Sequence, residues 1–173
     1  MNKKKYIKKY LTRLDQYDKG TTISWNKLSE EELNAYSKAL GKEIPKSYRW
    51  FLETFGESSL FGFGFEGKIE YSGYTIVDLN KEKVAELEPF LGAGLEKRYL
   101  FFIDESSYGY AFDYDRILID NEPEVICWDW MGVYPEKKNF YSFLWDEIKN
   151  YFDNEEELAF LIDEADKEYF EWK

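Results

Sequence analysis

Histidine is absent from the 173-residue sequence, and cysteine occurs once, at Cys127. The absence of histidine excludes Ser-His-Asp and Cys-His catalysis, histidine-ligated zinc and the most common pH-sensing side chain. A single cysteine forms no internal disulfide, which is typical of a protein in a reducing cytoplasm. Because no histidine can activate it and its neighbours are apolar, Cys127 is predicted to be a buried, inert thiol.

Long apolar runs are also missing. No stretch reaches 18 consecutive apolar residues, so no membrane-spanning helix is expected. The positively charged start, Met1–Lys5, is not followed by the apolar segment of a secretory signal. No Pro- or Gly-rich linker and no repeat of 20–50 residues divides the chain. We therefore expect one domain over residues 1–173, in the cytoplasm.

Negative charge and aromatic residues are abundant instead. The sequence has 35 acidic and 23 basic residues, a net charge of −12, and 20% aromatic residues. Such acidity argues against general binding to nucleic acid or to an anionic membrane, because both need a basic face. The aromatic content argues against a disordered acidic tail.

The charge is unevenly distributed between the two ends of the chain. Residues 1–20 carry a net charge of +5 and follow a helical apolar period, which predicts a basic amphipathic helix ahead of the core. Residues 154–173 are rich in acids and are predicted to form an acidic C-terminal helix. The basic helix either packs on the domain or contacts a partner, and it pairs with the acidic end within or between chains. Both a monomer and a weak homodimer fit these patterns.

Local patterns predict the order of the elements. Ser29 and Glu32 form a capping box at the start of a helix that Gly41 ends, and a second helix is expected from Ser47 to Phe55. A run of short strands then follows, including one at 74–77, with a helix beginning near Asn80 inside the run. Two C-terminal helices finish the chain. Helices, then mainly strands, then helices indicate the α+β class.

The block Leu40–Leu52, with its Leu-Gly-x-x-Ile-Pro step and a Phe-Leu pair in the following helix, resembles the SUKH superfamily (SMI/KNR-type domains). Leu100–Asp113 is similar to the central hairpin of that family, and the resemblance covers about residues 22–150. The family pattern departs at Phe55-Gly56, where an Asn before the Gly is usual. The resemblance implies a mixed, largely antiparallel sheet flanked by N- and C-terminal helices. It also implies a binding protein, since bacterial members are commonly immunity proteins that silence secreted toxins.

Carboxylates are the only plausible catalytic groups, and no pattern of them indicates an enzyme. Asp104 and Glu105 with Asp120 or Glu122 lack the spacing of a calcium loop, so no metal site is predicted. The glycines between Gly62 and Gly67 lack the remainder of a phosphate-binding motif, so no cofactor is expected.

An acidic and aromatic surface is the better candidate for function. Tyr110, Phe112 and Tyr114 share one face of a predicted strand, so Asp113 and Asp115 on the other face are expected to be exposed. Tyrosine and tryptophan are frequent anchors at protein interfaces. The residues predicted to contact a partner are Asp104, Glu105, Tyr108, Asp113, Asp115, Asp120 and Glu122.

The resemblance to the SUKH superfamily implies an immunity protein that neutralises a cognate bacterial toxin by stoichiometric occlusion, and the acidic, aromatic surface fits a basic toxin. A toxin that acts on nucleic acid is expected, because such toxins have positive clefts that an acidic surface complements. The alternative is an intracellular scaffold or regulatory module of the same fold. A carboxylate- or metal-dependent enzyme is the least favoured of the three.

Overall fold

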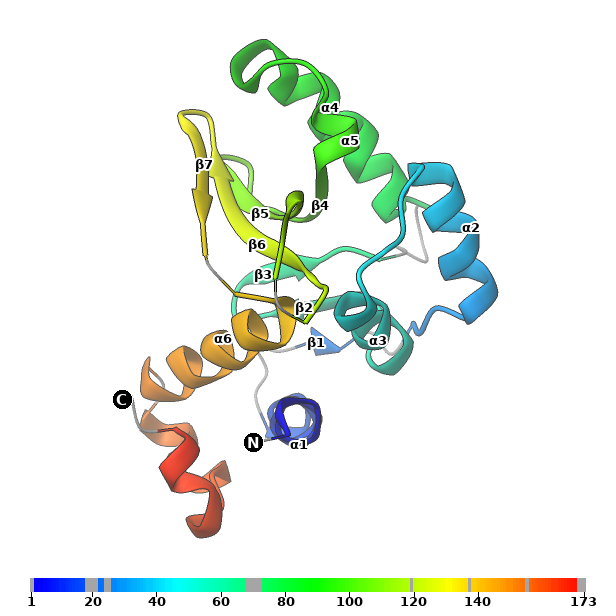
Figure 1. Ribbon diagram of the computed structural model, residues 1–173. Helices are drawn as coiled ribbons and strands as arrows, with labels where there is room; N and C mark the ends of the chain where they lie inside the picture. The colour runs from blue at the N-terminus through cyan, green and yellow to red at the C-terminus, as the bar shows by residue number, and fades with distance from the viewer. Residues whose placement is uncertain are drawn as a thin grey trace.

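The structure is a computed structural model that describes residues 2–17, 22–23, 26–67, 73–118, 120–136, 138–154 and 156–170. Figure 1 shows the arrangement of its helices and strands. In chain order these are α1 (Lys3–Tyr17), β1 (Thr22–Ile23), α2 (Glu30–Leu40), α3 (Lys46–Thr54), β2 (Ser58–Leu60), β3 (Phe63–Phe65), α4 (Ile76–Leu91), α5 (Leu95–Arg98), β4 (Tyr99–Asp104), β5 (Tyr108–Ile117), β6 (Pro123–Asp129), β7 (Gly132–Pro135), α6 (Phe140–Asn154) and the 3-10 helices η1 (Glu156–Leu161) and η2 (Glu164–Tyr169).

The strands form two antiparallel sheets, which confirms the α+β class. One sheet has the order β1-β2-β3 and the other the order β4-β5-β6-β7, and every pairing between the described strands is antiparallel. The two sheets are linked just beyond β3, where the Glu66 amide donates to the Phe102 carbonyl oxygen at 3.0 Å.

Helices cover both faces of the four-stranded sheet (Figure 1). On one face Phe102 and Phe112 contact Phe140 of α6, with ring centroids 5.6 and 5.9 Å apart. On the other face Phe101 and Trp128 belong to a second core cluster, which α4 and α5 complete. Because both faces are covered, β4 is an almost continuous apolar run instead of an alternating one.

The helix α2 follows its sequence signals closely. The Ser29 side chain accepts from the Glu32 amide at 3.2 Å, and the Glu32 carboxylate accepts from the Ser29 amide at 2.9 Å. Gly41 ends the helix with a φ of 68°, a left-handed conformation that glycine adopts without steric cost. The capping box and the glycine cap predicted from sequence are therefore confirmed.

The region after β3 corrects two predictions. Residues 74–77 do not form a strand, and the helix does not begin at Asn80. Thr75 is the N-cap of α4 and forms a capping box with Asp78. Asn80 is instead a buried residue whose side chain bridges to β4, donating to the Phe101 carbonyl oxygen and accepting from the Phe101 amide, both at 2.9 Å. Since β4 is an edge strand, Asn80 satisfies backbone groups that no neighbouring strand pairs with.

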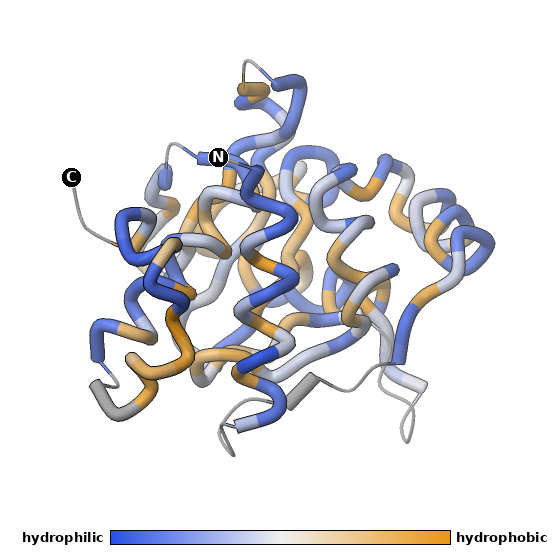
Figure 2. The backbone as a smooth tube through the Cα atoms, turned by 90° about the horizontal axis from the view of Figure 1, so that it is seen from below, coloured by the Kyte–Doolittle hydropathy of each residue, from blue (hydrophilic) through white to orange (hydrophobic). Residues whose placement is uncertain are grey.

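The two ends of the chain pack together over α6. The ring centroid of Tyr10 on α1 lies 5.8 Å from that of Phe152 and 4.8 Å from that of Phe170. Hydrophobic and hydrophilic residues alternate along α1 in Figure 2. Lys9 pairs with Asp163 and Asp166. The basic helix therefore packs on the domain and pairs with the acidic end within one chain.

The acidic end is not the single helix predicted from sequence. It forms η1 and η2, which are separated at residues 162–163. Asp163 there has an extended backbone, with φ of −64° and ψ of 141°. Its carboxylate contacts the Arg13 guanidinium at 2.9 Å. Tertiary pairing with α1 thus accompanies the interruption of the helix.

Candidate functional site

The residues predicted to contact a partner do not form one surface. Strand β5 has ten residues. At a rise of about 3.3 Å per residue its ends lie roughly 30 Å apart. Asp104, Glu105 and Tyr108 lie at its first end, where β4 turns into β5. The other four lie at or toward its second end, namely Asp113, Asp115, Asp120 and Glu122.

Asp113 is buried, so the prediction that its face of the strand is exposed is wrong. Only 1% of its side chain is exposed, and its carboxylate accepts from Arg98 Nε at 3.0 Å and Nη2 at 2.8 Å. The physical reason is that α5 ends beside this position, because Tyr99 at the start of β4 pairs with Asp113. Asp115, two residues further, is exposed.

Glu122 is also internal. It is buried and accepts from the Ser47 hydroxyl at 2.7 Å, at the first turn of α3. Pro45 at the N-cap of α3 provides no side-chain cap. Glu122 therefore supplies the negative charge that the N-terminus of this helix favours. Asp120 is exposed and accepts from the Asn139 side chain.

The first end of β5 carries the more accessible acidic and aromatic group. The β4–β5 and β6–β7 turns meet there, because Tyr108 pairs with Asp129 at the start of the β6–β7 turn. Exposed fractions are 38% for Tyr108, 46% for Tyr134 and 88% for Met131. We call Glu105, Tyr108, Asp129, Met131 and Tyr134 the hairpin-end surface.

Hydrogen bonds fix the acids of the hairpin-end surface. Asp129 Oδ1 accepts from the Met131 amide at 2.7 Å and the Gly132 amide at 3.0 Å, so it shapes the β6–β7 turn. Glu105 Oε1 accepts from the Gly64 amide at 3.1 Å. Within the described part of the chain neither carboxylate has a cationic partner. Asp104 differs, because Lys83 Nζ lies 2.8 Å from its Oδ2.

Further carboxylates lie near this surface, and the pKa of Glu66 responds to several of them. Burial, together with Glu57, Asp104 and Glu105, raises the pKa of Glu66 to about 7. Burial also raises the pKa of Glu147 on α6. The result is a concentration of negative potential at one end of the sheet.

Some of these residues carried a sequence signal and others did not. Tyr134 and Asp129 lie in an acidic and aromatic stretch that the sequence shows. Met131 carries no such signal, and Glu66 becomes part of the group only because β3 lies beside β4. Cys127 is partly buried, and its pKa is raised by burial and by Glu136 and Asp129, which agrees with an unreactive thiol.

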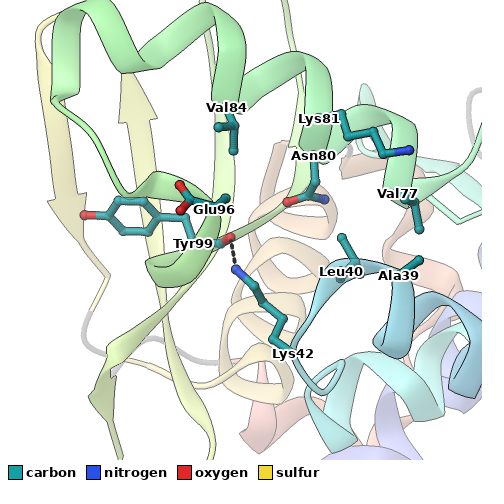
Figure 3. Close-up of a pocket in the computed structure, with 9 residues that line it drawn as sticks. All are labelled: Ala39, Leu40, Lys42, Val77, Asn80, Lys81, Val84, Glu96 and Tyr99. Carbon is teal, nitrogen blue, oxygen red and sulfur yellow. Dashed lines mark hydrogen bonds between the residues drawn. The ribbon is translucent and has the colours of Figure 1, made fainter.

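A groove lies between α2 and α4, with a volume of about 340 Å³ (Figure 3). Lys42 reaches into it and donates to the Tyr99 carbonyl oxygen at 2.7 Å. Burial lowers the pKa of Lys42 to about 8. The residues that line the groove are Ala39, Leu40, Lys42, Val77, Asn80, Lys81, Val84, Glu96 and Tyr99.

Metal-binding and membrane-spanning features were sought in the described ranges. No group of three or more Cys, Asp or Glu residues there has the arrangement to hold a metal ion. No helix in the described residues is both long and apolar enough to cross a membrane.

Comparison with known proteins agrees with the resemblance drawn from the Leu40–Leu52 block. None of the curated proteins matches the chain. The profile of the SMI1 / KNR4 family (SUKH-1) matches residues 27–154, which includes the groove, the four-stranded sheet and the hairpin-end surface. The elements α1, β1, η1 and η2 lie outside the match. The match covers well over half of the 173 residues, and the chain therefore belongs to the SMI1 / KNR4 family (SUKH-1), which includes toxin immunity proteins.

Proposed function

We propose that this protein is an immunity protein that binds a cognate bacterial toxin and neutralises it by occlusion. The partner is a basic protein, and a toxin that acts on nucleic acid fits best because its substrate cleft is positive. The role is one of binding and not of catalysis, it needs no cofactor, and it is carried out in the cytoplasm.

The observation that carries the proposal is the hairpin-end surface. Tyr108, Met131 and Tyr134 are exposed beside Glu105 and Asp129, whose charges are not neutralised by any described cation. Exposed aromatic and methionine side chains supply interface anchors, and surrounding carboxylates supply electrostatic attraction to a basic partner.

The surface is also held in place before binding. Asp129 fixes the β6–β7 turn, and Glu105 is tied to the Gly64 amide. Tyr108 contacts Phe63 of β3, with ring centroids 6.4 Å apart. A surface fixed in this way loses little conformational entropy when a partner binds.

The other sheet end is the less suitable surface. Asp113 and Glu122 are engaged by Arg98 and Ser47, so they belong to the fold. Asp115 and Asp120 are exposed there and provide acidic positions for control variants, although Arg98 Nε lies 3.4 Å from the Asp115 carboxylate.

The test is co-expression with the product of the neighbouring gene, scored by capture of a stoichiometric complex and by rescue of growth. The double variant Tyr108→Ala/Tyr134→Ala should reduce both, because it removes two interface anchors. The control Phe160→Ala removes a ring that is 69% exposed on η1, far from this surface along the chain, and should leave both unchanged. A toxic neighbour that the wild-type protein neither captures nor silences would contradict the proposal.

A further inference from the structure

The groove between α2 and α4 combines an apolar lining with an unusual cation. Leu40 comes from α2, Val77 and Val84 come from α4, and Tyr99 of β4 closes one side (Figure 3). A volume of about 340 Å³ is at the lower end of the range for small-molecule sites. Nine residues line the groove, far fewer than the roughly 20–30 residues that each partner contributes to a stable protein interface.

Lys42 is a half-buried cation whose hydrogen-bond partner is a neutral carbonyl oxygen, and Glu96 is the acid that acts on it electrostatically. Its ammonium donates to the Tyr99 carbonyl oxygen at 2.7 Å and lies 5.3 Å from the centre of the Tyr114 ring. An ammonium has three donor hydrogens, and buried charges in proteins are normally paired with an opposite charge. Within the described residues, no carboxylate lies within ion-pair distance of Lys42.

The charges around the groove favour an anion. Lys81 lies at the opposite end of the groove from Glu96 in Figure 3, and it has no ion pair among the described residues. Two such lysines beside one apolar groove are notable in a chain of net charge −12. Glu96 is the one acid in the lining, and it makes no ion pair with Lys42 among the described contacts.

We propose that this groove binds a small carboxylic acid with an apolar tail. The carboxylate pairs with the Lys42 ammonium, and the tail lies against Leu40, Val77 and Val84. Such a ligand gives Lys42 a directly paired carboxylate and also covers the apolar lining of the groove. The site is distinct from the hairpin-end surface and does not depend on the role proposed for that surface.

Burial lowers the pKa of Lys42 to about 8 although Glu96 acts in the opposite direction, which agrees with a cation that has no directly paired carboxylate. It also gives a pH dependence. The ammonium is charged below about pH 8 and neutral well above it, so binding of a carboxylate should weaken at pH 9.5 relative to pH 7.

The test uses octanoate as the probe, with octan-1-ol and octylammonium as probes of equal tail length and different charge. Binding to the full chain is followed by calorimetry and by amide chemical shifts. We expect saturable binding of octanoate, at least about ten-fold tighter than octan-1-ol, because a charge-assisted hydrogen bond is lost with the alcohol. Octylammonium should not bind, and shifts should be confined to α2, α4 and the start of β4.

Variants separate this site from unspecific apolar binding. Lys42→Met keeps the apolar stem and should lower the affinity for octanoate about ten-fold or more. The control Lys8→Met, at an exposed position on α1, should leave this affinity unchanged. Val84→Trp fills the groove and leaves the lysine in place, so it should also abolish binding. Equal affinity of octanoate for wild type and Lys42→Met, or no saturable binding, would overturn the proposal.

Discussion

Replacing Glu66 by Gln should make the protein more stable at neutral and alkaline pH. The Glu66 side chain follows β3, and within the described residues it makes no hydrogen bond or ion pair. Burial and the carboxylates of Glu57, Asp104 and Glu105 raise its pKa from 4.5 to about 7. The folded state therefore disfavours the charged form, and glutamine removes the charge while keeping the size of the side chain.

The magnitude follows from the size of the shift. One pKa unit corresponds to 1.36 kcal/mol, so a shift from 4.5 to about 7 sets an upper limit of about 3 kcal/mol. Glu66 is only partly buried, and solvent screens the repulsion. We expect a gain of about 1–2 kcal/mol in the free energy of unfolding at pH 8.

The direction of the pKa shift determines how the stability difference between the variant and wild type changes with pH. Below the unfolded pKa of about 4.5 the Glu66 carboxyl group is protonated in both the folded and the unfolded state, so it does not change the free energy of unfolding. The cost of the charge grows between about pH 4.5 and pH 7 and is constant above that. The advantage of the variant should thus be largest at pH 8 and small at pH 5.

Urea unfolding followed by tryptophan fluorescence at pH 5 and pH 8 measures this difference. Glu53→Gln, at an exposed position on α3, removes the same charge and serves as the control. A Glu66→Gln variant that is equally stable to wild type at pH 8, or less stable, would refute the reasoning that this carboxylate is penalised in the folded state.

Four further variants test the packing that positions the two sites. Asp113→Asn should lower the free energy of unfolding by about 2–3 kcal/mol, because Arg98 loses its buried counter-charge; urea unfolding that matches wild type would contradict this. Asn80→Ala should lower it by about 2 kcal/mol, since buried backbone groups of β4 lose their partners, and amide exchange in β4 should accelerate. Asp166→Asn should lower the melting temperature at pH 7, because hydrogen bonds from Lys9 and Tyr10 hold the pKa of this carboxyl below 3.8; the difference from wild type should shrink as the pH falls below about 4. Gly109→Ala should cost about 1–3 kcal/mol, because a Cβ would lie 2.1 Å from a β4 carbonyl oxygen; an unaffected melting curve would contradict this packing.

Much of the fold could be predicted from local sequence because the relevant signals act locally. The capping box of α2 and the glycine after it involve residues within four positions of the helix end, so sequence spacing alone identifies them. The start of α4 was missed although Thr75 and Asp78 carry the same type of signal. The β-branched and aromatic residues of 74–77 favour a strand by composition. In the structure, helix capping by Thr75 and tertiary packing make Ile76 the first residue of α4 instead.

The candidate site was less predictable because it depends on contacts distant in sequence. Strand alternation correctly places Phe112 and Asp113 on opposite faces, but it does not show that α5 covers the second face. Glu122 resembles a surface acid in sequence and becomes internal through Ser47, 75 residues away. Tyr108 and Glu105 were identified from composition, whereas Met131 and Glu66 join the same end of the sheet only through strand pairing and the contact between β3 and β4.

The association rate with the cognate toxin shows where on this protein the partner binds. Glu105→Gln/Asp129→Asn removes two charges from the hairpin-end surface while keeping hydrogen-bond acceptors, and Asp115→Asn/Asp120→Asn removes two from the other sheet end. We expect the first pair to slow association several-fold at low salt and to reduce its salt dependence, and the second pair to have a clearly smaller effect. Equal slowing by both pairs, or slowing by the second pair alone, would contradict the placement of the partner at the hairpin-end surface.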